Sequence, residues 1–381
     1  MMLVRPYLAQ ALLIAISAFT TVTALADSGR NSYVVTNLTS DSSGVAPHTD
    51  PVLQNPWGVA FSPDGGPFWI ADNATGCSTL YGGHGAAVAL QISIPLPGNV
   101  VPITSCRTVD PKNPPHNAAP TGVIWNPSPT FLVPGTSSQA TFIFDAEDGT
   151  LSAWASGGLY SSNNAVIAVN NSKKGAVYKG LAFGVNVHGP FLFATNFNAG
   201  TIDVFGRNGS DGHFTPATTD GGFADPNLPA GYAPFGIQNI DGNFFVTYAK
   251  QDAAKKDDVP GPGNDYVDIF NTNGYLLRRF VSMGPLNSPW GVARASYAFG
   301  PFSGQILIGN FGNGKINVFD LNGQFIDALD GPDGKALRID GLWTLTLGGG
   351  RNSSPDTLYF TAGPNDEMNG LFGTITPASA N

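Results

Sequence analysis

Apolar residues recur along this chain in short segments, and one arrangement of them returns six times. Each copy has a glycine that opens a short apolar segment, a second apolar segment, and a polar turn rich in Asn, Asp or Glu. The opening glycines follow one another at intervals of 50 to 64 residues, at Gly58, Gly122, Gly180, Gly236, Gly291 and Gly341. A period near fifty with several strands in each copy is typical of a β-propeller.

The first copy shows the pattern most clearly. We expect strands over residues 58–61, 68–71 and 78–81, with a turn that begins at 72. The second segment of most copies is almost continuously apolar (FWIA, FLFAT, ILIG), which favours sheets packed on both faces. After the N-terminal segment there is no convincing amphipathic helix, and this argues against an α/β fold.

The last copy lacks a fourth strand, because residues 371–376 form its third strand and the chain ends soon afterwards. Residues 33–38 (YVVTNL) form an unassigned strand before the first copy. We therefore predict that this N-terminal strand completes the last blade and closes the ring, which removes exposed sheet edges. The prediction is an all-β, six-bladed β-propeller that forms one domain over residues 27–381.

The N-terminus has the features of an export signal. Arg5 supplies a positive charge, residues 7–20 are mostly apolar, and Ala24-Leu25-Ala26 has the A-x-A pattern of a cleavage site. A membrane anchor is the alternative, but the run is short and contains Ser, Thr and Gln. We expect residues 1–26 to be a signal peptide cleaved near Ala26 and the protein to be secreted or periplasmic.

The net charge of the chain makes some classes of binding partner improbable. The chain carries 18 basic and 27 acidic residues, a net charge of −9, and removing a leader that contains Arg5 makes it −10. This balance argues against nucleic acid and anionic membrane surfaces, which attract clustered Lys and Arg. No later run has the length of a membrane span. We expect a monomer that binds a small polar molecule, a sugar or a protein.

The chain has two cysteines, Cys77 and Cys106. Since an exported protein meets an oxidising compartment, we expect them to form a disulfide between the third strand of the first copy and the loop that follows. A pair of metal ligands is the weaker alternative because the two thiols lack a C-x-x-C spacing.

The repeats resemble NHL-type propeller repeats. Over about residues 33–376 the chain also resembles a family of exported bacterial and fungal propeller proteins of unknown function. The segments that carry this resemblance are YVVTNLTSD (33–41), NPWGVAFSP (55–63), AEDGTLSAW (146–154), LPAGYAPFGIQ (228–238), SPWGVA (288–293) and FTAGPNDEMNGLFG (360–373). The resemblance implies the propeller fold and export, and it brings no established chemistry.

In propellers of this type, the turns between the second and third strands surround the central channel on one face. Their Asn, Asp and Glu side chains would converge there, offering oxygen ligands to Ca²⁺ or hydrogen bonds to a sugar. Most Asn and Asp residues are also ordinary turn formers, whereas glutamate has no such preference. We therefore select Glu147 and Glu367 as candidate catalytic residues. The candidate ligand-binding residues are Trp57, Asn73, Asp148, Asn196, Trp290, Asn310 and Asn365.

Aromatic residues stand at or near the start of four of the innermost strands, at Trp57, Phe235, Trp290 and Trp343. They could wedge between neighbouring blades, or they could form a stacking platform for a flat ligand at the channel mouth. Both interpretations remain open at this stage.

Two functions fit these observations. The preferred one is a binding protein whose polar, acidic channel face holds a small molecule, a sugar or a protein partner. The alternative is a Ca²⁺-dependent lactonase, other hydrolase or lyase that uses a carboxylate such as Glu147 or Glu367 as general base. Asp72 and Asp340 are its candidate metal ligands. Among the residues we place at the starts of the inner strands, only Asp340 is acidic, which weakens the alternative.

Overall fold

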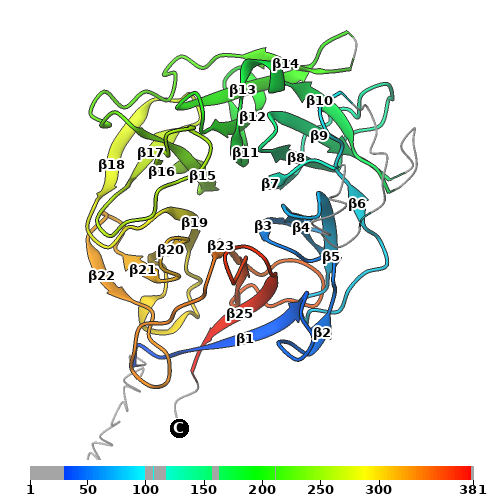
Figure 1. The fold of residues 1–381 in the computed structure, drawn as a ribbon. Helices are drawn as coiled ribbons and strands as arrows, with labels where there is room; N and C mark the ends of the chain where they lie inside the picture. Colours follow the sequence, from blue (N-terminus) through cyan, green and yellow to red (C-terminus); the bar gives the residue numbers. More distant parts are fainter. Residues whose placement is uncertain (1–29, 99–105, 107–116, 157–162, 211, 379–381) are drawn as a thin grey trace, which may run out of the picture.

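The computed structural model of the chain is a ring of six β-sheets, the blades, around a central axis (Figure 1). It describes residues 30–98, 106, 117–156, 163–210 and 212–378. The all-β, six-bladed propeller predicted from the repeats is confirmed. The predicted signal peptide, residues 1–26, lies outside the described residues.

Each blade is a sheet whose strands pair antiparallel, except for one short parallel pair in blade 6, and the strand named first in each blade is innermost. Blade 1 consists of β3 (Pro56–Ala60), β4 (Phe68–Asp72), β5 (Cys77–Tyr81) and β6 (Ile92–Ser93). Blade 2 consists of β7 (Pro120–Trp125), β8 (Phe142–Ala146), β9 (Thr150–Trp154) and β10 (Val166–Asn170). Blade 3 consists of β11 (Tyr178–Asn186), β12 (Gly189–Asn196), β13 (Thr201–Asn208) and β14 (Phe214–Ala217).

The second half of the ring repeats this order. Blade 4 consists of β15 (Tyr232–Ile240), β16 (Asn243–Lys250), β17 (Tyr266–Asn271) and β18 (Leu276–Ser282). Blade 5 consists of β19 (Pro289–Arg294), β20 (Ile306–Asn310), β21 (Ile316–Phe319) and β22 (Phe325–Ala328). Blade 6 consists of β23 (Leu342–Leu347), β24 (Leu358–Ala362), β25 (Leu371–Pro377), β1 (Tyr33–Ser40) and β2 (His48–Thr49).

The N-terminal strand closes the ring as predicted. β1 pairs antiparallel with β25, from Tyr33 opposite Pro377 to Ser40 opposite Leu371. Figure 1 shows this junction where the blue β1 lies beside the red β25. The only helices in the described ranges are two 3₁₀ turns, η1 (Ser172–Lys174) and η2 (Gly300–Phe302), and neither is long or apolar enough to cross a membrane.

All six inner strands have an irregularity at one equivalent place. The pairing register with the second strand shifts between residues 56 and 59, 120 and 123, 178 and 181, 234 and 237, 289 and 292, and 342 and 345. The shift brings adjacent blades close together, and a Cβ added to Gly236 would lie 2.2 Å from the carbonyl oxygen of Trp290. Glycine therefore fills this position in five blades.

In blade 6 the structure places a different residue at the glycine position than the one we chose from the sequence. A Cβ added to Gly291 of blade 5 would meet the carbonyl oxygen of Trp343 at 2.5 Å, so Trp343 is equivalent to Trp290, and Thr344 stands where the other blades have glycine. Gly341, which we aligned with the other glycines, instead lies in the turn before β23 with φ +64°. Asp340 is accordingly not at the equivalent start of an inner strand.

The core of the described residues lies between blades rather than in one centre. Six clusters of buried apolar side chains each join two neighbouring blades, and a seventh lies on the axis. Residues of β4, β8 and β20 are all buried, because a blade packs against a neighbour on each face. This explains why the second strands are almost continuously apolar.

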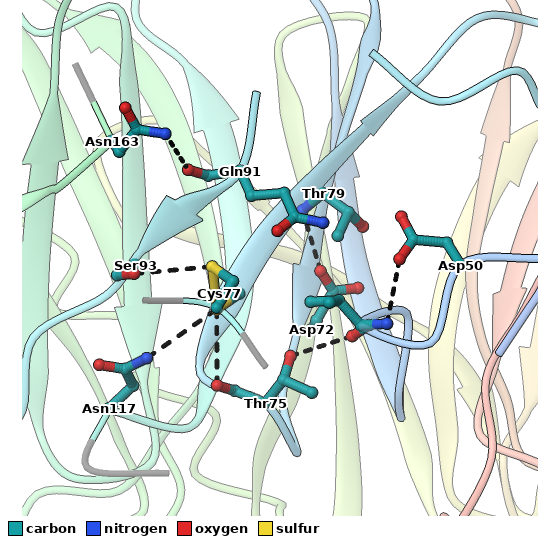
Figure 2. Close-up of a disulfide and its surroundings, with 11 residues drawn as sticks. Asp50, Asp72, Thr75, Cys77, Thr79, Gln91, Ser93, Asn117 and Asn163 are labelled. Carbon is teal, nitrogen blue, oxygen red and sulfur yellow. Dashed lines mark hydrogen bonds between the residues drawn. A yellow bond between two sulfur atoms is a disulfide. The ribbon is translucent and has the colours of Figure 1, made fainter. Parts of the chain in front are cut away.

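The disulfide between Cys77 and Cys106 is confirmed. Cys77 is the first residue of β5, and its partner belongs to the connection between blades 1 and 2. Figure 2 shows its surroundings, in which the Asn117 amide points to the sulfur of Cys77 and the backbone N–H of Thr79 donates to Asp72 at 2.9 Å. The bond fastens a long connection to a buried strand.

Candidate functional site

Aromatic side chains fill the channel where the inner strands begin. We call Trp57, Phe197, Phe235, Trp290 and Trp343 the axial cluster. Trp57 and Trp343 stack with ring centroids 3.5 Å apart, and each is in edge-to-face contact with Trp290. Trp57 and Trp290 are each only 3% exposed. They therefore do not form the exposed stacking platform that we considered, and they meet across the axis rather than wedging only between neighbouring blades.

The indole N–H groups tie this cluster to the polar groups around it. Trp290 donates from Nε1 to the carbonyl oxygen of Lys179 at 2.8 Å, and Trp343 donates to Oδ1 of Asn55 at 2.9 Å. The Nε1 of Trp57 is buried and has no acceptor among the described residues. Beyond the cluster the channel widens into a cavity of about 250 Å³ between β3, β7, β11 and β15.

Polar side chains from several blades converge at the other end of the axial cluster. We call Asn55, Asn73, Glu147, Lys179 and Glu367 the mouth cluster. Lys179 pairs with Oε1 of Glu147, and the Asn73 amide donates to Oε2 of the same carboxylate at 3.2 Å. The Asn55 amide donates to Asn73 at 3.4 Å and to Glu367 at 2.5 Å. Blades 1, 2, 3 and 6 thus contribute to one hydrogen-bonded group.

Lys179 is the centre of charge in the mouth cluster. Its side chain is 2% exposed, and its ammonium lies 5.2 Å from the ring centroid of Trp57. Asp257, on the loop after β16 of blade 4, approaches the ammonium at 3.0 Å but is 59% exposed itself. Burial lowers the pKa of Lys179, and Glu147 and Asp257 together more than reverse this effect, so the pKa is raised. The lysine is a fixed cation.

Glu367 is presented by an unusual backbone. Asn365, Asp366 and Glu367 have φ values of 59°, 51° and 64°, which place three consecutive non-glycine residues in the left-handed region. Such strain persists only where surrounding contacts impose it, and it is often found at binding or catalytic sites. Burial raises the pKa of Glu367, and the Asn55 hydrogen bond partly opposes the shift.

Five of the predicted site residues belong to the mouth or axial cluster, namely Glu147, Glu367, Asn73, Trp57 and Trp290. The other candidates lie elsewhere. Asp148 accepts from Thr150 Oγ1 at 2.7 Å and from the N–H of Ala119 at 3.3 Å, so it supports its turn, and burial raises its pKa to about 6.

The remaining asparagines do not face the mouth cluster. Asn310 is fully buried and donates to the carbonyl oxygen of Pro285 at 2.8 Å. Asn365 is exposed, and its backbone N–H donates to Asp340 at 2.8 Å. Asn196 donates to Asp203 at 3.1 Å in a separate cavity. The side-chain amide of each of these three residues thus donates to a local partner outside the mouth cluster, which for Asn365 is Asn369.

The two candidate metal ligands lie in different settings. Asp72 is fully buried at the end of β4, where burial raises its pKa well above the usual range, and Asp340 receives the N–H of Asn365 at the surface. Within the described residues, no group of three or more His, Cys, Asp or Glu side chains is arranged to hold a metal ion.

Asn55, Lys179 and Asp257 were not among the site residues predicted from the sequence. Lys179 precedes its glycine just as Trp57 and Trp290 do, so its place near the axis could have been inferred from the repeat. Asn55 has φ +45° and precedes a proline, and Asp257 lies in an insertion. No feature of the single sequence indicates that either residue lies near the channel.

No family model matches the chain. An uncharacterized protein of Acanthamoeba polyphaga mimivirus is 31% identical over 355 residues, covering 90% of this chain and 79% of the viral protein. A second uncharacterized mimivirus protein is 30% identical over 347 residues, covering 90% and 85%.

Solved structures with similar folds include a streptogramin B lyase, with a TM-score of 0.49 and 12% identity over 91% of this chain and 97% of the lyase. A gluconolactonase from Xanthomonas campestris has a TM-score of 0.46 and 13% identity over 86% and 88% of the two chains. The activities in these names are those of the two solved proteins.

Proposed function

This chain belongs to the same family as the two uncharacterized mimivirus proteins, and we propose that it is a binding protein whose mouth cluster holds a small, hydroxyl-rich molecule such as a sugar. The observation that carries the proposal is the convergence itself. Side chains from four blades, with Asp257 from a fifth, form one hydrogen-bonded group directly on the axial cluster.

The chemistry of the mouth cluster suits hydroxyl groups. Glu147 and Glu367 offer carboxylate oxygens that accept hydrogen bonds, while Asn73 and Lys179 carry donors. Glu147 is 13% exposed, so its carboxylate borders solvent although its partner Lys179 is buried. Rigid, prearranged polar groups beside an aromatic layer lower the entropic cost of binding a small polar ligand.

The buried ammonium favours this function over the Ca²⁺-dependent alternative. Lys179 already supplies a positive charge beside Glu147 and Asp257. A divalent cation at the same carboxylates would be repelled by it and would have to replace existing hydrogen bonds to Glu147 and Glu367. The alternative stays a proposal that metal dependence can test.

The test is isothermal titration of the full chain with a panel of neutral monosaccharides, uronic acids and sugar lactones. We expect at least one member to bind and Asn73→Ala to weaken its binding about tenfold, because the substitution removes an amide donor and the hydrogen bond that orients the Glu147 carboxylate, and a hydrogen bond to a charged group contributes about 1.5 kcal/mol. Asn322→Ala, an exposed asparagine remote from the mouth cluster, is the matched control. Equal binding by wild type and Asn73→Ala, or binding of no member, would refute the proposal. Chelator-sensitive hydrolysis of the lactones would support the enzyme instead.

A further inference from the structure

A second cavity, of about 400 Å³, lies between the connection that enters blade 3 and the outer strands of that blade. Asn196, which lines it, is the residue directly before Phe197 of the axial cluster. The two side chains therefore leave the chain toward different sites, one toward the cavity and one toward the axis. The lining residues that matter here are Asn171, Lys174, Asn196, Asp203, Phe205 and Pro216.

Asp203 is the acidic residue that lines this cavity. Its Oδ2 accepts from the hydroxyl of Tyr178 at 2.9 Å and from the Asn196 amide at 3.1 Å, and its Oδ1 accepts from Thr201 at 3.2 Å. The Tyr178 hydroxyl in turn accepts from Asn171 at 2.8 Å. Every one of these donors is neutral. In the part of the chain that the structure describes, Asp203 forms no ion pair with a Lys, Arg or His.

A cation lines the same cavity without neutralising this anion. Lys174, in η1, forms no ion pair among the described residues, and its ammonium is therefore more than 4.0 Å from the Asp203 carboxylate. The cavity thus carries separated negative and positive groups. Phe205, Pro216 and Ala176 contribute apolar surface to the same walls.

We infer that this cavity binds a free α-amino acid, whose ammonium pairs with Asp203 and whose carboxylate pairs with Lys174. A zwitterion compensates both charges at once, and the apolar wall suits an aliphatic side chain. The volume lies within the range of small-molecule pockets, which begins at roughly 300 Å³. A purely structural network around Tyr178 would need the hydrogen bonds of Asp203 but neither its charge nor the ammonium of Lys174. The site is independent of the mouth cluster.

The test is isothermal titration of the full chain with L-leucine, N-acetyl-L-leucine and L-leucinamide. We expect leucine to bind and each blocked form to bind at least about tenfold more weakly, because each loses one charged contact. Asp203→Asn should weaken leucine binding at least about tenfold and leave N-acetyl-leucine unchanged. Lys174→Gln should weaken leucine binding and leave leucinamide unchanged.

The controls separate this site from the mouth cluster and from folding. Asp356→Asn, an exposed aspartate in blade 6, and Glu147→Gln should both bind leucine like the wild type. If Asp203→Asn does not fold, the binding of N-acetyl-leucine and leucinamide to the wild type still tests the inference. So does the Lys174→Gln variant, since Lys174 is exposed. Absence of leucine binding, equal binding of the blocked forms, or a Lys174→Gln variant that binds like the wild type would overturn the inference.

Discussion

Replacing Lys179 with methionine removes the buried cation of the mouth cluster while keeping a chain of similar length. Glu147, which is 13% exposed, then loses its compensating charge, whereas Asp257, at 59% exposed, regains water. Breaking a buried pair by removing one partner costs about 3–5 kcal/mol, and an exposed pair contributes less than about 1 kcal/mol. Since Glu147 borders solvent, we expect Lys179→Met to lower the free energy of unfolding by about 3 kcal/mol.

The assay is urea denaturation followed by tryptophan fluorescence, to which the three tryptophans of the axial cluster contribute. Glu147→Gln should cost less than Lys179→Met, and Asp257→Asn should cost less than about 1 kcal/mol. The Lys179→Met/Glu147→Gln double variant should be more stable than Lys179→Met alone, because the less exposed of the two carboxylates that lose Lys179 is then replaced by a neutral amide. A double variant whose cost equals the sum of the two single costs would refute the pairing.

Three further predictions concern the scaffold. Asp145 is fully buried, burial raises its pKa to about 7, and the unfolded chain releases this proton from about pH 4; stability is therefore lost as the pH rises between these values. Asp145→Thr introduces the threonine that blades 3, 4 and 6 have at the equivalent position. In pH-dependent denaturation its free energy of unfolding should gain up to about 4 kcal/mol over that of the wild type between about pH 4 and pH 8, and the same pH dependence in both proteins would contradict this. Replacing Cys77 and Cys106, which are 29 residues apart, with alanine should cost about 3–4 kcal/mol in urea denaturation, and an unchanged midpoint would argue against the crosslink. Gly236→Ala forces a Cβ against the backbone of the next blade and should cost about 3 kcal/mol, whereas Gly206→Ala, with 3.5 Å to its nearest neighbour, should be tolerated; equal melting temperatures would refute the contact.

The fold could be predicted because its physical causes recur along the chain. Five blades have glycine where neighbouring inner strands meet, and the second strands carry apolar residues on both faces, so both features repeat along the sequence. The alignment failed only in blade 6, where Thr344 occupies the glycine position and Gly341 lies three residues earlier in a turn. A single sequence does not reveal such a shift, because it depends on contacts with the neighbouring blade.

The candidate site was predictable only in part. Glu147 and Glu367 were singled out because glutamate is not a usual turn residue, and the structure brings both into one hydrogen-bonded group through Asn73 and Asn55. Which polar side chains from different turns come into contact depends on the direction in which each side chain points. The spacing of the residues along the sequence does not determine that direction. For the same reason the spacing did not predict that Asn310, one of the candidate ligand-binding residues, is fully buried and donates to the carbonyl oxygen of Pro285.

The central claim is that the mouth cluster is the ligand-binding site. Its most direct test is a crystal structure of the full chain with the tightest-binding sugar of the panel. We predict ligand density in contact with Glu147, Asn73 and Glu367, over the axial cluster. Density in another cavity, with the hydrogen bonds of the mouth cluster unchanged and solvent alone beside Glu147, would contradict the account.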